Sequence, residues 1–293
     1  MSLRITPLTD PAHGPRSRRL AWLASDADSI PAGAAFLRLF TDPGQEHLAE
    51  LTLHVHPAER RKRVGSRLLD AAVAAARDNA RRRVVAQAEA RSPGDRFLEA
   101  RGFRKVLTLR CSRLSLADVD TAALAGIIER PHPGYRLVSW RGVVPHGLAQ
   151  TFAASRRAMD DMPMEDTDHG SVTWDVDRVR AAAKAVEQRG DLLHTVVAID
   201  ASNGSVAGFT ELVVPGNGTG DGQHYGTGVL PEHRGHGLGR WMKAESIRQV
   251  HGLYPGLGGL LTDTADSNTH MRHINDSLGY TPTHTTHQYQ LDT

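Results

Sequence analysis

Apolar and polar residues alternate along this 293-residue chain in two regular patterns. Runs in which every second residue is apolar are typical of strands with one buried face, whereas apolar residues three and four positions apart are typical of amphipathic helices. The segment Glu50–His56 shows the first pattern, and residues 68–76 show the second, through Leu68, Leu69, Ala72, Val73 and Ala76. The succession of such segments predicts a mixed α/β fold.

In the first part of the chain, the pattern predicts strands at Leu3–Pro7, Arg19–Ala24, Ala34–Phe40, Glu50–His56, Arg83–Ala88 and Phe103–Leu114, and a short helix ending at Gly102. An Ala-rich helix is predicted at Leu116–Glu129. In the second part, it predicts strands at Tyr135–Trp140, Leu193–Asp200, Ser205–Val214, His224–Leu230 and Gly259–Ala265. Helices are predicted at Pro145–Ala158, at Val176–Gln188, after Gly239 and before Gly279, and the Gly-rich segment Pro215–Gln223 is predicted to be a loop.

A faint internal repeat divides the chain. The segment Val55–Ser66 aligns with Val229–Arg240 without gaps, and Phe97–Phe103 aligns with Ile274–Tyr280 at nearly the same offset. Two matches at one offset predict two copies of one fold. We therefore expect an N-terminal domain over residues 1–115, a linker over 116–134 and a C-terminal domain over 135–293.

The segment Val229–Arg240 combines the end of a strand, three glycines and the start of a helix. Glycine allows the backbone to turn sharply and to approach a ligand closely. The first amides of a helix have no partner within the helix, and they attract anions. The spacing matches neither a P-loop nor a dinucleotide-binding fingerprint. The pattern indicates a phosphate site of another kind.

This segment resembles motif A of the Gcn5-related N-acetyltransferases (GNAT), because Arg234, Gly237 and Gly239 fill the signature Arg/Gln-x-x-Gly-x-Gly/Ala. Residues 266–280 resemble motif B of the same family, in which an Asn opens a helix that ends in Leu-Gly-aromatic. The resemblance covers residues 135–291. It implies an α/β fold with a mixed sheet, present as two tandem GNAT acyl-CoA N-acyltransferase folds, and acetyl-CoA as the cosubstrate.

The same resemblance assigns the coenzyme-binding residues. The backbone of Val229 and Leu230 is expected to pair with the pantetheine arm. Asn268 and Asn275 are expected near the pantetheine and the sulfur, although Asn268 can equally be a simple helix cap. The pyrophosphate is expected on Arg234, Gly235, His236, Gly237, Leu238, Gly239 and Arg240.

Catalysis in this family proceeds by direct attack of the acceptor amine on the thioester. Glu211 is our candidate for the base, with His224 and Tyr225 in reserve, because a carboxylate beside an apolar cleft can accept the proton of the amine. The alternative is that Glu211 is only a charge on the solvent face of a strand. Asn275 is also expected in the catalytic site. Many relatives carry there a Tyr that protonates the thiolate, whereas Asn can only donate a hydrogen bond.

The first copy departs from the motif. Arg63 stands where the first signature glycine is expected, and no Asn matches Asn268. A side chain at position 63 is expected to obstruct the backbone approach to a phosphate. The first copy is therefore expected to be structural, or a weak, non-catalytic coenzyme binder.

Composition bears on the partners, the cofactors and the cellular compartment of the protein. The formal charge of +2 implies no nucleic-acid surface, and the one cysteine, Cys111, excludes an intramolecular disulfide. No apolar run approaches 18 residues, so no membrane partner is expected. The histidine spacing matches no zinc signature, so no metal is expected. These features predict a cytoplasmic monomer or homodimer.

The predicted function is transfer of acetyl from acetyl-CoA to a primary amine of a small molecule: an amino-sugar antibiotic, a polyamine or a metabolic amine. One alternative is an enzyme similar to the mycothiol synthases, tandem GNAT members that acetylate the cysteinyl amine of a sugar-linked thiol precursor. A second alternative is a non-catalytic acyl-CoA sensor or scaffold, and a third is a protein-modifying acetyltransferase.

Overall fold

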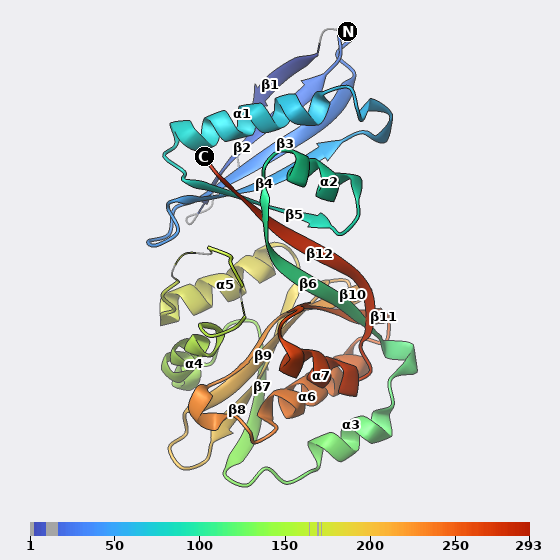
Figure 1. Ribbon diagram of the computed structural model, residues 1–293. Helices are drawn as coiled ribbons and strands as arrows, with labels where there is room; N and C mark the ends of the chain where they lie inside the picture. Colours follow the sequence, from blue (N-terminus) through green and yellow to red (C-terminus); the bar gives the residue numbers. More distant parts are fainter. Residues whose placement is uncertain (1–2, 10–16, 164, 169, 171) are drawn as a thin grey trace. The chain divides into compact units, whose positions relative to one another are not determined.

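The computed structural model describes residues 3–9, 17–163, 165–168, 170 and 172–293. The chain forms two compact units. Unit 1 comprises Met1–Thr108, Met164–Val172 and Thr285–Thr293, and unit 2 comprises Leu109–Pro163 and Thr173–His284. Each unit contains a β-sheet with helices packed against it (Figure 1).

The sheet of unit 1 has the strand order β1-β2-β3-β4-β5-β12. Its neighbouring strands run antiparallel, except that β4 and β5 are parallel. The elements are β1 (Arg4–Leu8), β2 (Ser17–Ser25), β3 (Pro31–Phe40), β4 (Leu48–Val55), α1 (Val64–Asp78), β5 (Arg83–Glu89), α2 (Pro93–Ala100) and β12 (Thr281–Asp292). Helix α1 lies across β2, β3 and β4 (Figure 1) and buries Leu68, Leu69, Ala72 and Ala76 against them.

The sheet of unit 2 has the order β6-β11-β10-β9-β8-β7, and again one pair, β10 with β11, is parallel. Its strands are β6 (Arg104–Ser115), β7 (Tyr135–Arg141), β8 (Leu192–Asp200), β9 (Val206–Val214), β10 (Gly220–Val229) and β11 (Leu257–Ala265). Its helices are α3 (Thr121–Ile128), α4 (Ala149–Ser155), α5 (Val176–Gln188), α6 (Leu238–Leu253) and α7 (Thr269–Ser277). The two sheets therefore share one topology.

Helices cover both faces of the unit 2 sheet. Successive side chains of β8 show this, because they pack alternately against two different helices. Val196 and Ala198 pack with Trp241 and Met242 of α6. The residues between and beyond them, Val197 and Ile199, pack with the cluster that contains Phe152 of α4. Because successive side chains of a strand point to opposite faces, α6 and α4 lie on opposite sides of the sheet.

Each sheet is completed by a strand from the other half of the sequence. Residues 286–292 of β12, at the end of the chain, pair with β5 in unit 1. Residues 109–115 of β6 pair with β11 in unit 2. Tyr289 of β12 is fully buried in the unit 1 core, where its hydroxyl donates to Asp95 at 2.6 Å. The repeat in the sequence predicted two copies of one fold but gave no sign of this exchange.

Most predicted elements are present within a few residues of their expected bounds, but the loop predicted at Pro215–Gln223 is partly wrong. β10 already begins at Gly220. Gly222 packs so closely that an added Cβ would lie 3.1 Å from Leu260 Cδ2. Glycine within a strand marks this kind of close approach, although it removes the apolar alternation that reveals a strand.

Two predicted helices are shorter than expected. The segment 116–129 forms a 3₁₀ turn at Leu116–Asp118 and then α3, whose first turn is capped by Asp120 at 2.9 Å from the amide of Ala123. The segment 145–158 contains α4 between two 3₁₀ turns.

Candidate coenzyme site

The two parallel strands of unit 2 diverge. β10 and β11 pair only from Gly220–Leu257 to Gln223–Leu261. Beyond that point β10 pairs with β9 alone, and β11 pairs with β6 alone. The separation leaves two strand edges facing each other without a ladder between them, so an extended ligand can be inserted there.

A β-bulge lies where the strands part. The pairing of β10 with β9 shifts register between His224 and Gly226, so that Tyr225 is the extra residue. Bulges are common beside active sites because they redirect backbone groups and side chains. The bulge marks the closed end of the gap between β10 and β11.

At the open end of this gap lies the phosphate loop, which we define as residues Arg234–Arg240. Gly235 and Gly237 adopt left-handed backbone conformations, with φ of 82° and 73°. Gly237 is the N-cap of α6, and no side chain caps this helix. The amides of its first turn therefore remain available to an anion from outside the helix.

A cavity of about 680 Å³, here called the coenzyme cavity, extends from the phosphate loop along the end of β10 at Thr227, Gly228 and Val229 and is bordered by α7. One part of its wall is apolar and includes Met162, Met271 and Ile274. The cavity collects most of the coenzyme-binding residues predicted from the sequence: Val229, Arg234, Gly235, Gly237, Leu238, Gly239, Arg240 and Asn268.

Three predicted coenzyme residues do not line this cavity. The amide of Leu230 donates to the carbonyl of Ala207 at 2.9 Å. Successive amides of a strand point in opposite directions. The amide of Leu230 therefore points towards β9, whereas the amide of Val229 points away from β9. His236 lines a neighbouring cavity, and Asn275 is a buried residue of α7. Their roles in coenzyme binding stay predictions.

Arg234 is already paired with an acid. Its guanidinium contacts both carboxylate oxygens of Asp161, at 2.6 and 2.8 Å, and its Nε donates to the carbonyl of Val229 at 3.1 Å. The hydrogen bond to Arg234 lowers the pKa of Asp161, and the same bond raises the pKa of Arg234. A phosphate that uses the side chain of Arg234 must displace Asp161.

The two predicted asparagines hold α7 in place. Asn268 is the N-cap of α7, and its Oδ1 accepts from the amide of Met271 at 3.0 Å. The amide nitrogen of Asn275 donates to the hydroxyl of Thr264 at 3.0 Å. The Oδ1 atom of Asn275 is buried and has no partner among the described residues. The amide nitrogen carries two hydrogens, so a second donor remains beside the bond to Thr264.

Glu211 lies on β9, and its side chain forms a buried ion pair with Arg156 at 2.5 Å. The guanidinium of Arg156 is surrounded by aromatic rings, with centroids 4.5 to 4.8 Å away, from Phe152, Trp174 and Phe209. Glu211 is not part of the lining of the coenzyme cavity. Its role as a base stays a prediction.

A second buried polar cluster joins His224, a reserve candidate for the base, to Tyr280 and Lys243, for which no role was predicted. His224 Nε2 lies 2.7 Å from the hydroxyl of Tyr280, and Lys243 Nζ lies 4.9 Å from the centre of the Tyr280 ring. Burial lowers the pKa of Lys243 to about 7 and moves the pKa of His224 well below its usual value. Lys243 is a buried residue of α6, and its ammonium faces the ring of Tyr280 instead of solvent.

Unit 1 keeps the backbone of the site and changes its side chains. Arg63 is the N-cap of α1 with φ 65° and ψ 7°, close to the 73° and 8° of Gly237. β4 and β5 also diverge, after Leu51 and Ala86. Ser92 caps α2 as Asn268 caps α7, so a polar cap does correspond to Asn268. Whether the side chain of Arg63 obstructs a phosphate stays a prediction.

These features can now be compared with known proteins. The profile of the acetyltransferase (GNAT) family matches residues 5–103 and 158–280. The chain belongs to this family. The two GNAT matches fall on either side of the segment that was expected to be a linker, so the fold class and the tandem GNAT arrangement predicted from the sequence are confirmed.

Among the relatives of this GNAT protein, a mycothiol acetyltransferase of Thermobifida fusca is 29% identical over 281 residues, which cover 92% of this chain and 82% of that one. A mycothiol acetyltransferase of Pseudarthrobacter chlorophenolicus is 30% identical over 278 residues, covering 89% and 76%. A solved structure, a tandem GNAT protein from the clavulanic acid biosynthesis pathway, superposes with a TM-score of 0.79 at 24% identity over 96% of this chain and 84% of that one.

Two further properties concern metals and membranes. Among the described residues of this GNAT protein, no group of three or more His, Cys, Asp or Glu side chains is placed to hold a metal ion. No described helix is long and apolar enough to span a membrane.

Proposed function

We propose that unit 2 of this GNAT acetyltransferase binds acetyl-CoA in the coenzyme cavity and transfers the acetyl group to a primary amine of a small molecule. The observation that carries the proposal is the gap between β10 and β11, which leads from the phosphate loop to the bulge at Tyr225. In this arrangement the pyrophosphate lies on the amides of the phosphate loop. The pantetheine arm lies along the apolar wall, and the thioester lies towards the bulge.

Direct attack requires an amine that has lost its proton and is held beside the thioester. Cys111, which lies outside the coenzyme cavity, is not needed in such a transfer because no acyl-enzyme forms. Glu211 is the first candidate to accept the proton, directly or through water. His224 is the second candidate, since its lowered pKa keeps the imidazole neutral near pH 7.

The first acceptor to test is the cysteinyl amine of a sugar-linked thiol, the substrate class of mycothiol synthases. Two relatives that align with about nine-tenths of this chain are named mycothiol acetyltransferases. The tandem arrangement is consistent with this choice. Amino sugars, polyamines and metabolic amines form the rest of the panel.

The experiment is to incubate the full chain with acetyl-CoA and each amine in turn and to detect acetylated product by mass spectrometry. This readout is needed because a thiol acceptor interferes with assays that detect free coenzyme A as a thiol. We expect acetylation of one class of amine, and loss of that activity in Gly237→Glu. Binding of acetyl-CoA without a product from any amine of the panel would contradict the proposed reaction.

A non-catalytic acyl-CoA binder remains the second candidate, and Asn275 is the observation that favours it. The position where many relatives carry a tyrosine acid holds an amide whose nitrogen already donates to Thr264. Tight binding of acetyl-CoA, combined with hydrolysis and transfer rates no higher than those without protein, would favour the binder over the enzyme.

A further inference from the structure

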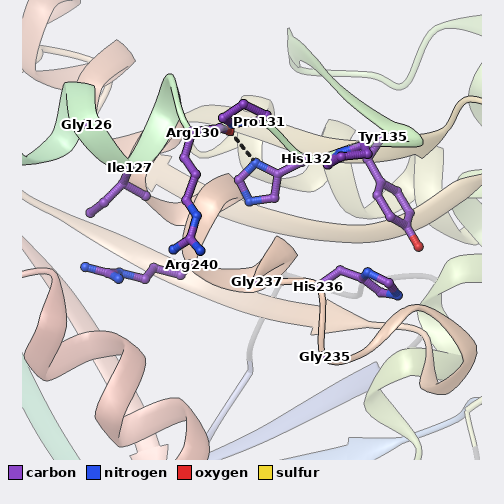
Figure 2. Close-up of a pocket in the computed structure, with 11 residues that line it drawn as sticks. Gly126, Ile127, Arg130, Pro131, His132, Tyr135, Gly235, His236, Gly237 and Arg240 are labelled. Carbon is purple, nitrogen blue, oxygen red and sulfur yellow. Dashed lines mark hydrogen bonds between the residues drawn. The ribbon is translucent and has the colours of Figure 1, made fainter.

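A second cavity, of about 470 Å³, shares the phosphate loop with the coenzyme cavity. Gly235, Gly237 and Arg240 line both. The remaining wall of the second cavity comes from α3, from the segment that follows it and from the neighbouring loop and strand (Figure 2): Gly126, Ile127, Arg130, Pro131, His132, Pro133, Tyr135 and His236. Apart from the residues of the shared phosphate loop, nothing in this second cavity has a role in the proposed acetyl transfer.

The segment that follows α3 is held firmly against α6. The indole nitrogen of Trp241 donates to the carbonyl of Ile128 at 3.1 Å. The ring of His132 stacks on Trp241 with centroids 4.0 Å apart and planes 9° from parallel. The residues expected to be a linker therefore form a fixed wall beside the phosphate loop.

The second cavity is cationic. Arg130 and Arg240 line it, and none of the described residues of its lining is acidic. Figure 2 shows the guanidinium of Arg130 directed towards Arg240. The buried Nε of Arg240 has no partner within the described part of the chain. Two guanidinium groups that line one cavity repel each other unless an anion lies between them. Arginine side chains bind phosphate especially well, because their planar guanidinium can donate two parallel hydrogen bonds.

His132 adds an acceptor to this wall. Its Nδ1 lies 2.8 Å from the carbonyl oxygen of Arg130, which can only accept, so in the neutral ring Nδ1 carries the proton. The Nε2 atom is then a free acceptor, and it lies 3.6 Å from the position that a Cβ on Gly237 would occupy. This nitrogen can accept a hydrogen bond from a ligand hydroxyl group that lies next to the phosphate loop.

We propose that the second cavity binds the 3′-phosphorylated ribose of the coenzyme, with the 3′-phosphate between Arg130 and Arg240. The inference rests on the proposed function, because it takes acetyl-CoA as the ligand of the phosphate loop. The apolar wall of the coenzyme cavity suits the pantetheine on one side of the pyrophosphate. The ribose and its 3′-phosphate then lie on the other side, where the cationic cavity begins.

The test compares acetyl-CoA with 3′-dephospho-acetyl-CoA by calorimetric titration of the full chain. A hydrogen-bonded phosphate between two guanidinium groups is worth roughly tenfold to a hundredfold in affinity, so we expect the wild type to bind the dephospho compound more weakly by that factor. In Arg130→Ala the ratio of the two affinities should fall severalfold, to the part that Arg240 alone supplies. The matched control is Arg136→Ala, an exposed arginine of β7 outside the cavity, which should keep the wild-type ratio.

Each outcome bears on the proposal. Equal binding of both compounds by the wild type, or a wild-type ratio in Arg130→Ala, would overturn the assignment while leaving the acetyl-CoA site in place. If neither compound binds, the proposed function fails, and the inference fails with it. Arg130 is exposed, so its replacement leaves the fold intact. Unchanged thermal unfolding of the variant would verify this.

Discussion

Replacement of Gly237 by glutamate tests the phosphate loop most directly. Gly237 lies at the mouth of both cavities and caps α6 with its backbone in the left-handed region. A glutamate side chain there places a Cβ and a negative charge where the phosphate is expected. The site can hold a side chain, because the nearest atom to the added Cβ would be His132 Nε2, 3.6 Å away. Arg63 in unit 1 shows that a non-glycine residue can adopt this backbone conformation.

The expected loss of affinity follows from the contacts removed. A hydrogen bond to a charged group contributes about 1.5–3 kcal/mol, and the side chain would displace a phosphate from about two amides of the first turn of α6. The loss of about 3–6 kcal/mol corresponds to a weakening of roughly 100-fold to 10,000-fold in the dissociation constant. The left-handed backbone conformation itself costs about 1–2 kcal/mol of folding stability in a residue with a Cβ.

The measurement is calorimetric titration with acetyl-CoA, together with thermal unfolding of the same samples. The control is Gly204→Glu, because Gly204 has φ of 76° in the turn between β8 and β9, with no atom within 4 Å of an added Cβ. Both variants should lose a few degrees in melting temperature, since about 1 kcal/mol shifts it by roughly 2–4 °C in a domain of this size. Only Gly237→Glu should lose affinity.

Acetyl-CoA affinity in Gly237→Glu within threefold of the wild type would refute the placement of the pyrophosphate on this loop. Equal losses of affinity in the two variants would also refute it, since the effect would then come from backbone strain alone.

Three further perturbations follow from the structure. Asp161→Asn removes the carboxylate that competes for Arg234, and acetyl-CoA affinity should rise about twofold to fivefold at low salt, because exposed ion pairs contribute less than about 1 kcal/mol. In the wild type, the pKa of Lys243 is about 7 in the folded protein and 10.5 in the unfolded chain, so the unfolded chain binds more protons between these pH values. The free energy of unfolding of the wild type should therefore rise with pH across this window, by up to about 5 kcal/mol. Lys243→Met should abolish this rise. Denaturant unfolding at pH 6 to 10 checks this rise. Removal of residues 285–293 should unfold unit 1, because β5 loses its partner strand; hydrogen exchange followed by peptide would show lost protection in β4 and β5.

Each of these has its own control. Glu232→Gln, which breaks an exposed ion pair with Arg157 outside the coenzyme cavity, should leave affinity unchanged, and an equal gain would show that the effect of Asp161→Asn is general electrostatics. A rise in stability with pH that is as steep in Lys243→Met as in the wild type would exclude Lys243 as its source. Persistent protection of β5 after truncation would show that β12 is dispensable.

The phosphate loop was predictable because its chemistry is local. The glycines, the helix start and the arginine lie within a dozen residues, and one strand–loop–helix unit positions all of them. The partner of Arg234 was not predictable, because Asp161 lies in a distant loop and only the fold brings it to the loop.

The features that the sequence did not predict also depend on contacts between distant parts of the chain, or on strands without a regular apolar pattern. β12 reads Thr-Pro-Thr-His-Thr-Thr-His, with few apolar positions, so its pattern does not identify a strand. Lys243 was assigned no role because a lysine in a helix is usually exposed, whereas here the fold buries it against Tyr280. The ion pair of Glu211 with Arg156 forms because the fold brings the 3₁₀ turn after α4 close to β9, which no local pattern encodes.

The strand exchange has a consequence for how this protein is made. β5 ends at Glu89, yet its partner β12 begins only at Thr281, so the sheet of unit 1 cannot close until the strands and helices of unit 2 have been synthesised. Neither half of the gene encodes a self-sufficient domain, and a cut anywhere between the halves leaves two open sheet edges that can pair with other chains. Both copies must therefore stay in one polypeptide if both sheets are to close.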